Sequence, residues 1–220
     1  MADSYVGELF VNVNQNKIWN TETAMRHYNE LTKDRPRTRV AYGFDNQTND
    51  FFDQLFLVTD ARNVLEIGMG HGTFAYHYLW QNHNINYKAI DNDPKWTENA
   101  ELLEGWFGDR FSFDVVDSQT YNMQEDPNRD TYDMLICNGS YPDTNELTND
   151  IQLGVVAGVD WIFVDNLNRQ TIRRALTWCE DENPQFPYEL ETTCMYKKEG
   201  FTGDGKFRTH KIVGALYRRV

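Results

Sequence analysis

The sequence has few cysteines, and none of them stands at a metal-ligand spacing. Cys137, Cys179 and Cys194 are far apart and odd in number, without the paired spacing of a zinc site. Cys137 falls in an apolar run, where a reduced and buried thiol is expected. This cysteine usage predicts no cysteine-based metal centre and favours a reducing compartment.

Long apolar runs are missing as well. No segment approaches the roughly 20 apolar residues that a membrane helix needs. The first ten residues, MADSYVGELF, carry Asp3 and Glu8 where a signal peptide would be basic and then apolar. We therefore expect a soluble, cytoplasmic protein that makes no contact with membranes.

Basic charge is scarce, because 21 lysines and arginines stand against 34 aspartates and glutamates, for a formal net charge of −13. Such a balance repels phosphates, so a nucleic acid partner is not expected. The local exception is KDRPRTR, residues 33–39. This stretch is compatible with capture of an acidic substrate, although charge runs of this kind more often form solvated loops.

Strand-like and helix-like periods alternate along the 220 residues, without a repeat or a linker that would divide them. This alternation predicts one α/β domain with a mostly parallel sheet and helices on both faces. The last two strand-like runs, separated by a glycine-rich stretch, predict an antiparallel hairpin at one edge. The expected strands are 63–67, 85–90, 110–116, 132–137, 159–164, 188–198 and 210–220, and the expected helices are 21–31, 49–58, 73–82, 93–106, 145–156 and 168–179.

Polar residues follow each of the first five expected strands. In open α/β sheets, ligands bind beyond the carboxyl ends of the strands, at the point where the strand order reverses. We therefore expect these residues to surround one crevice. They are Glu66 with the glycines that follow it, Asp91, Asp117, Asn138 and the pair Asp165-Asn166.

Three glycines at alternate positions, Gly68, Gly70 and Gly72, come directly after the strand in NVLEIGMGHG, residues 63–72. Glycine is the residue for backbone that takes positive φ or approaches a ligand. Asp91 lies about twenty residues further on, where an acidic side chain accepts the hydroxyls of a ribose. The dehydrogenase fingerprint G-x-G-x-x-G/A is not met, because its last position is Thr73, and no Walker-type phosphate loop is present.

LEIGMGHG resembles the first motif, E/D-x-G-x-G-x-G, of class I S-adenosylmethionine-dependent methyltransferases, and the likeness extends over about residues 48–220. The resemblance implies a Rossmann-like domain with a seven-stranded sheet, S-adenosylmethionine as donor and S-adenosylhomocysteine as product. Gly68 and Gly70 would let the backbone approach the methionine portion, Asp91 would hold the ribose hydroxyls, and Asp117 with Ser118 would face the adenine. The other expected cofactor-binding residues are Glu66, Gly72, Asn92 and Asn138.

The segments after strands four and five look like the small-molecule O-methyltransferases related to the catechol and caffeoyl-CoA enzymes. That group has an aspartate after strand four and Asp-Asn after strand five as ligands for a divalent cation. Asn138 departs from the first of these ligands, so we predict a metal-independent site in which Asp165 is general base or anchor, with Asn138 and Tyr141 beside it. In that family residues 1–47 would form a helical lid over the acceptor, with Trp19 and Tyr28 as candidate walls.

Two alternatives remain open. Asn138-Gly-Ser-Tyr141 has the N-x-x-Y spacing of amino-methyltransferases that act on adenine or glutamine, where an aromatic ring stacks on the target, but Gly139-Ser140 replaces their two prolines. The chain could instead be an inactive, cofactor-binding subunit of a partner enzyme. The acceptor itself and the oligomeric state, including a homodimer, are not determined by the sequence.

Overall fold

A computed structural model describes residues 26–27, 30–31, 54–81, 84–167, 169–183, 185–201 and 207–220, but not the side chains of 194–201 and 207–213. Four residues of the expected helix 21–31 are therefore described, and they are helical. Apart from these, the predicted lid of residues 1–47, with Trp19, Tyr28 and the basic stretch 33–39, lies outside the described residues. In the expected helix 49–58, helical backbone is described over 54–59.

The sheet has seven strands in the order β3-β2-β1-β4-β5-β7-β6. The first five are parallel, whereas β7 pairs antiparallel with both β5 and β6, so the predicted mostly parallel sheet with a terminal hairpin is confirmed. The chain order reverses between β1 and β4, which is the switch point of this topology. The strands are β1 (Asn63–Ile67), β2 (Asn86–Asp91), β3 (Phe111–Val115), β4 (Met134–Cys137), β5 (Trp161–Val164), β6 (Tyr188–Phe201) and β7 (Phe207–Arg219).

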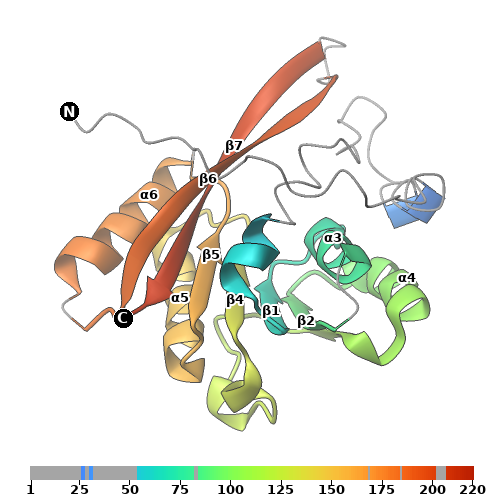
Figure 1. The fold of residues 1–220 in the computed structure, drawn as a ribbon, viewed down its shortest axis with the longest axis horizontal. Coiled ribbons are helices and arrows are strands. Elements are labelled where there is room, and N and C mark those ends of the chain that lie inside the picture. Colours follow the sequence, from blue (N-terminus) through green and yellow to red (C-terminus); the bar gives the residue numbers. More distant parts are fainter. Residues whose placement is uncertain are drawn as a thin grey trace.

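Helices cover both faces of the sheet, as predicted, with α3 (Thr73–Gln81) and α4 (Thr97–Phe107) on one side and α5 (Thr144–Ala157) and α6 (Gln170–Thr177) on the other (Figure 1). Successive strand residues point to opposite faces. Val64 accordingly packs in the core with α3 and α4, and its neighbour Leu65 packs in the core with α5 and α6. Cys137 and Cys179 are buried free thiols in the second of these cores.

The local differences from the expected elements lie at the ends of strands and helices. β4 and β5 begin two residues later than expected, and β6 and β7 extend into the stretch that was expected to form the turn. Asp93 was expected to cap a long helix, but it caps a 3₁₀ turn, η1 (Pro94–Trp96), and α4 begins only at Thr97. The helix expected over 168–179 ends in a π-helical turn, η5 (Trp178–Glu182). Three further 3₁₀ turns are η2 (Gly108–Arg110), η3 (Met123–Glu125) and η4 (Arg129–Thr131).

Beyond the pairing with β5, the hairpin of β6 and β7 continues on its own and projects from the body of the domain (Figure 1). Within the described ranges, no helix is long and apolar enough to cross a lipid bilayer.

Candidate functional site

A cavity of about 530 Å³ opens at the carboxyl ends of the five parallel strands. Backbone hydrogen bonds extend the sheet past the strand ends and keep the following residues in register. Gly68 N–H donates to Ile90 at 2.9 Å, Asn138 N–H donates to Ile67 at 2.9 Å, and Asp165 N–H donates to Cys137 at 3.0 Å. The segments after β1, β4 and β5 are thereby fixed at one edge.

Most of the residues predicted from the sequence line this one cavity, and two do not. Glu66 and Gly72 are buried outside the lining. The predicted residues that do line it are Gly68, Gly70, Asp91, Asn92, Asp117, Ser118, Asn138, Tyr141, Asp165 and Asn166.

The three glycines of the motif serve different purposes. At Gly68, with φ of +84°, an added Cβ would lie 2.6 Å from the Cα of Gly139, so the loops after β1 and β4 touch there. At Gly70, with φ of +54°, no atom lies within 4 Å of an added Cβ, so this position borders open space. At Gly72 an added Cβ would lie 2.6 Å from Leu103 of α4. Gly72 therefore allows close helix packing, while Gly70 leaves room for a ligand.

Asp91 is held by two backbone amides on the floor of the cavity. Its Oδ2 accepts from Gly70 N–H at 2.9 Å, and its Oδ1 accepts from Asp93 N–H at 3.0 Å. Each carboxylate oxygen has a second lone pair, so both remain able to accept hydroxyl groups from a ligand. The contact with Gly70 joins the end of β2 to the glycine loop. The Asp91 carboxylate and the open backbone at Gly70 therefore lie next to each other.

Glu66 lies behind the cavity and touches it through Asn138. Asn138 Nδ2 donates to Glu66 Oε1 at 2.9 Å, and the Tyr87 hydroxyl donates to Oε2 at 3.0 Å. Complete burial raises the pKa of Glu66 to about 8, although the two hydrogen bonds act in the opposite direction and lower it. This carboxyl group is therefore mostly protonated near neutral pH, and its geometric effect is to orient the Asn138 amide.

The opposite end of the cavity is formed after β4 and β5. Asp165 is nearly fully buried, at 1% exposure, and its Oδ2 accepts from Asn166 Nδ2 at 2.8 Å. Asn166 and Tyr141 have φ of +64° and +41°, and they are two of the three non-glycine residues with positive φ among those described. Backbone strain of this kind gathers at functional sites.

Tyr141 lines the cavity with a side chain that is almost fully buried. Its side chain is 4% exposed, and an added Cβ on Gly139 would lie 2.9 Å from the tyrosine Cζ, so the ring lies against that glycine. In this conformation the ring has little surface with which to stack on a ligand.

Asp150 and Gln119 are among the residues of the site that were not singled out from the sequence, although Asp150 carries a signal. Asp150 is a carboxyl group on the apolar face of α5, between Leu147 and Ile151, and burial raises its pKa to about 6. Gln119 joins it to the loop after β3, because Gln119 Nε2 donates to Asp150 Oδ1 at 3.0 Å. An acid at an apolar helix position is visible in a sequence, but its partner across the fold is not.

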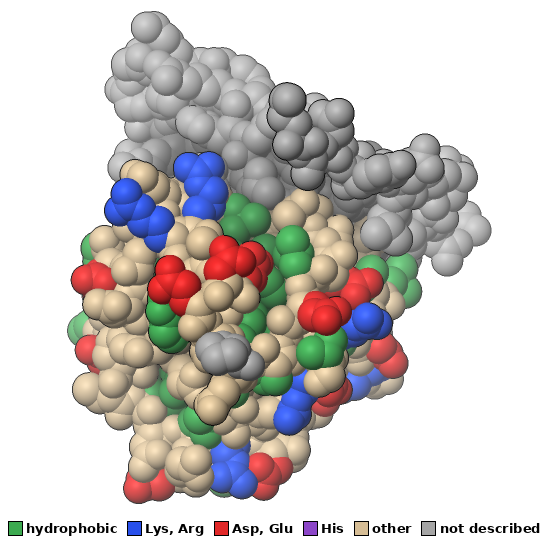
Figure 2. All heavy atoms as spheres, turned by 90° about the vertical axis from the view of Figure 1, so that its left-hand side faces the viewer, with side chains coloured by type: hydrophobic (Ala, Val, Ile, Leu, Met, Phe, Trp, Pro, Cys, Tyr) green, Lys and Arg blue, Asp and Glu red, His purple; other side chains and the backbone are tan. Residues whose placement is uncertain are grey.

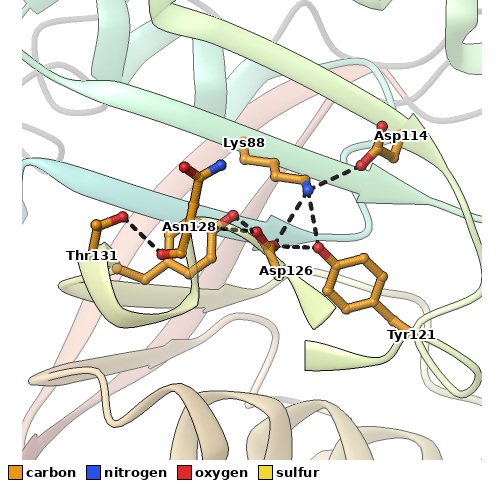
Figure 3. Close-up of polar contacts among 7 residues, drawn as sticks. Lys88, Asp114, Tyr121, Asp126, Asn128 and Thr131 are labelled. Atoms are coloured by element: carbon orange, nitrogen blue, oxygen red, sulfur yellow. Dashed lines mark hydrogen bonds and ion pairs between the residues drawn. The ribbon is translucent and has the colours of Figure 1, made fainter. Parts of the chain in front are cut away.

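A polar cluster centred on Lys88 holds the segment that carries Asp117 and Ser118 (Figure 3). Lys88 Nζ lies 3.0 Å from Asp114, 3.3 Å from Asp126 and 3.0 Å from the Tyr121 hydroxyl. The Asp126 side chain has no exposed surface, and it also accepts hydrogen bonds from the Tyr121 and Tyr132 hydroxyls. The loop between β3 and β4 is thus anchored to β2 by a buried charge with satisfied partners.

Among the described residues, no three histidine, cysteine or acidic side chains form a group able to hold a metal ion. Asp143, a possible substitute for the missing aspartate ligand at position 138, caps α5 instead. Its Oδ1 accepts from Asn145 N–H at 2.7 Å, and it does not line the cavity.

Comparison with known proteins gives one similar sequence and many similar structures. A tRNA1(Val) (adenine(37)-N6)-methyltransferase of a Flavobacteriaceae bacterium (strain 3519-10) is 35% identical over 95 residues, which are 42% of this chain and 39% of that protein. The matching region thus spans about two-fifths of that relative's length. No family model matches the chain.

The similar structures share the architecture rather than the sequence. The crystal structure of a proposed RNA methyltransferase from Pyrococcus horikoshii superposes with a TM-score of 0.62 at 14% identity, covering 90% of this chain and 99% of that one. The chain has the class I methyltransferase fold. A proposed caffeoyl-CoA O-methyltransferase from Staphylococcus aureus superposes with a TM-score of 0.55 at 15% identity, covering 89% and 91% of the two chains. The similar structures therefore include one named for an RNA substrate and one named for a small-molecule hydroxyl acceptor.

Proposed function

We propose that this chain is an S-adenosylmethionine-dependent methyltransferase that acts on a small-molecule acceptor, with a hydroxyl group as nucleophile. The observation that carries the donor assignment is the 2.9 Å hydrogen bond from Gly70 N–H to Asp91 Oδ2, beside the open space at Gly70. Asp91 and Asn92 would hold the ribose. Asp117 and Ser118 would face the adenine.

The donor supplies a methyl group on a sulfonium cation, and the carboxylates that line the cavity favour that positive charge. The protein's part is then to position an acceptor and to take up its proton. Asp165 is suited to the second task, because it is buried at the cavity wall and oriented by Asn166 at 2.8 Å. Asn138, oriented by Glu66, would hydrogen-bond the donor or the acceptor.

Methylation of an amino group, including the adenine of an RNA, is the second candidate. The sequence relative favours it, because its name describes an adenine N6-methyltransferase of tRNA. The burial of Tyr141 against Gly139 disfavours it, because an amino-methyltransferase of the N-x-x-Y type needs that ring to stack on the target. The acidic composition also opposes nucleic acid binding.

A mass-spectrometric screen for S-adenosylhomocysteine formation tests these assignments. Phenols, sugars, amines and an adenosine-containing oligoribonucleotide would each be incubated with S-adenosylmethionine and either the parent protein or Asp165→Asn. We expect turnover with a hydroxyl compound, and at least a hundredfold slower turnover in Asp165→Asn. Turnover confined to amines or to the oligoribonucleotide would support the second candidate. Donor binding without turnover on any acceptor class would instead indicate an inactive cofactor-binding subunit.

A further inference from the structure

Among the described residues that line the cavity, six carry a carboxyl group and two are lysine or arginine. The acidic members are Asp91, Asp93, Asp117, Glu146, Asp150 and Asp165, and the basic ones are Lys95 and Arg169. Lys95 belongs to the end of the cavity formed after β2. There it pairs with Asp93 and stands 4.5 Å above the ring of Trp96.

Arg169 lies at the opposite end, beside the residues that we assign to the acceptor. Its backbone N–H donates to Asn166 at 2.9 Å, and its guanidinium donates to the carbonyl of Ser140, so the side chain bridges the segments after β4 and β5. None of the ion pairs among the described residues includes Arg169, and its side chain is exposed. A guanidinium with one carbonyl partner keeps further N–H groups available.

A second arginine continues this charge along α6. Arg173 lies one helical turn beyond Arg169 and its N–H donates to the Arg169 carbonyl at 3.2 Å, so the two residues share a helix face. Arg173 and Arg174 line a groove of about 1080 Å³ between α5 and α6, and both are exposed. Figure 2 views the side of the molecule that carries these helices and shows Lys and Arg side chains at its upper left, close to acidic ones, with others at its right and lower parts.

We propose that the acceptor is a small molecule carrying a carboxylate or phosphate group, and that Arg169 binds this group. The inference rests on the proposed function. Six acidic side chains around the cavity would repel an anionic acceptor, and Arg169 supplies the charge that admits one at the acceptor end. Arginine is suited to this role because its planar fork donates two parallel hydrogen bonds to a carboxylate or phosphate.

Calorimetric titration tests the proposal without knowledge of the natural acceptor. The protein, with and without saturating S-adenosylhomocysteine, would be titrated with inorganic phosphate, with 3,4-dihydroxybenzoate and with the neutral 1,2-dihydroxybenzene. We expect both anions to bind more tightly than the neutral compound. Arg169→Gln should weaken the anions at least tenfold and leave the neutral compound unchanged. The matched control is Arg218→Gln, an exposed arginine of β7 that pairs with Glu191 and does not line the cavity, and it should change nothing.

Several outcomes would overturn the proposal: equal binding of charged and neutral compounds, anion binding that Arg169→Gln leaves intact, or an equal loss in Arg218→Gln. An oligoribonucleotide that binds through Arg169 while neither small anion binds would assign the arginines to nucleic acid and also contradict it. Arg169-dependent anion binding in a protein that does not bind S-adenosylhomocysteine would support the anion site and contradict the proposed methyltransferase function.

Discussion

Asn138 donates its side-chain N–H to Glu66 across 2.9 Å, so an amide on the cavity wall is oriented by a carboxyl group buried in the sheet. The pH dependence of the stability of Glu66→Gln should show whether that carboxyl group is protonated. Burial raises the pKa of Glu66 from 4.5 to about 8, so its favourable contribution to the free energy of unfolding is complete below pH 4.5 and is lost as the pH rises through 8.

Glu66→Gln is therefore expected to gain stability relative to the parent as the pH rises from 4.5 to 8. Urea denaturation across this range measures the difference. Asp150→Asn provides the comparison, because burial raises the pKa of Asp150 from 3.8 only to about 6, so its gain should be nearly complete near pH 6. A Glu66→Gln difference that does not vary with pH would contradict a protonated Glu66.

Gly70→Ala should reduce binding of S-adenosylhomocysteine much more than it reduces stability. No atom would clash with the new methyl group, so the folded protein should bear only the strain of positive φ, about 1 kcal/mol. Gly108→Ala is the control for ligand binding, since Gly108 also has positive φ (+59°) and open surroundings but does not line the cavity. Its ψ of −141° makes alanine strained there too, so Gly108→Ala should lower the melting temperature, and ligand binding should weaken in Gly70→Ala alone. Equal affinity in both would remove the argument that Gly70 leaves room for the donor.

Lys88→Met should destabilise the fold through the cluster that anchors the loop between β3 and β4. It leaves Asp126, which has no exposed side-chain surface, without its cation, and we expect a loss of about 2–3 kcal/mol. Asp114→Asn removes the other carboxylate near Lys88, but that side chain is 55% exposed, so its loss should be below about 1 kcal/mol. Chemical denaturation of the two variants measures this contrast. Equal losses would mean that Asp126 gains little from Lys88.

The predicted metal independence is tested with chelator once an acceptor is known. Asn138 replaces a carboxylate that a hard divalent cation would use, and Asp143 is engaged as the cap of α5. Turnover should be the same with and without excess EDTA. Loss of turnover in EDTA, followed by recovery with Mg²⁺, would show that Asn138 and Asp165 bind a metal after all.

The sequence predicts this fold well because its signals are local. The runs that form β1, β4 and β5 are short and mostly apolar, and in each of β1 to β5 a polar residue lies within two positions of the observed strand end. Helix starts were less predictable. Asp93 and Pro94 form a strong start signal, but the same signal begins both 3₁₀ turns and α-helices. Which of the two forms depends on packing beyond the turn.

Within the candidate site, the sequence identified which residues follow the strands, but not which of them line the cavity and which act from behind it. Glu66 occupies the acidic position of the motif, yet it acts from behind Asn138, a contact between residues 72 positions apart. Gly72 belongs to the same glycine series but packs against α4. The exposed Arg169 has no distinguishing neighbour in the sequence, and only the fold brings it beside Ser140.

Binding of S-adenosylhomocysteine to the parent protein and to Asp91→Ala is the most direct test of the central claim that the cavity holds this donor. Calorimetry should give a dissociation constant in the micromolar range for the parent, about −8 kcal/mol. Asp91→Ala should weaken binding by about 1.5–3 kcal/mol, because it removes hydrogen bonds to both ribose hydroxyls. Asp109→Ala, which removes an exposed acid outside the cavity lining, should bind like the parent. No heat with S-adenosylhomocysteine or S-adenosylmethionine, together with tight binding of a nicotinamide dinucleotide, would contradict the account.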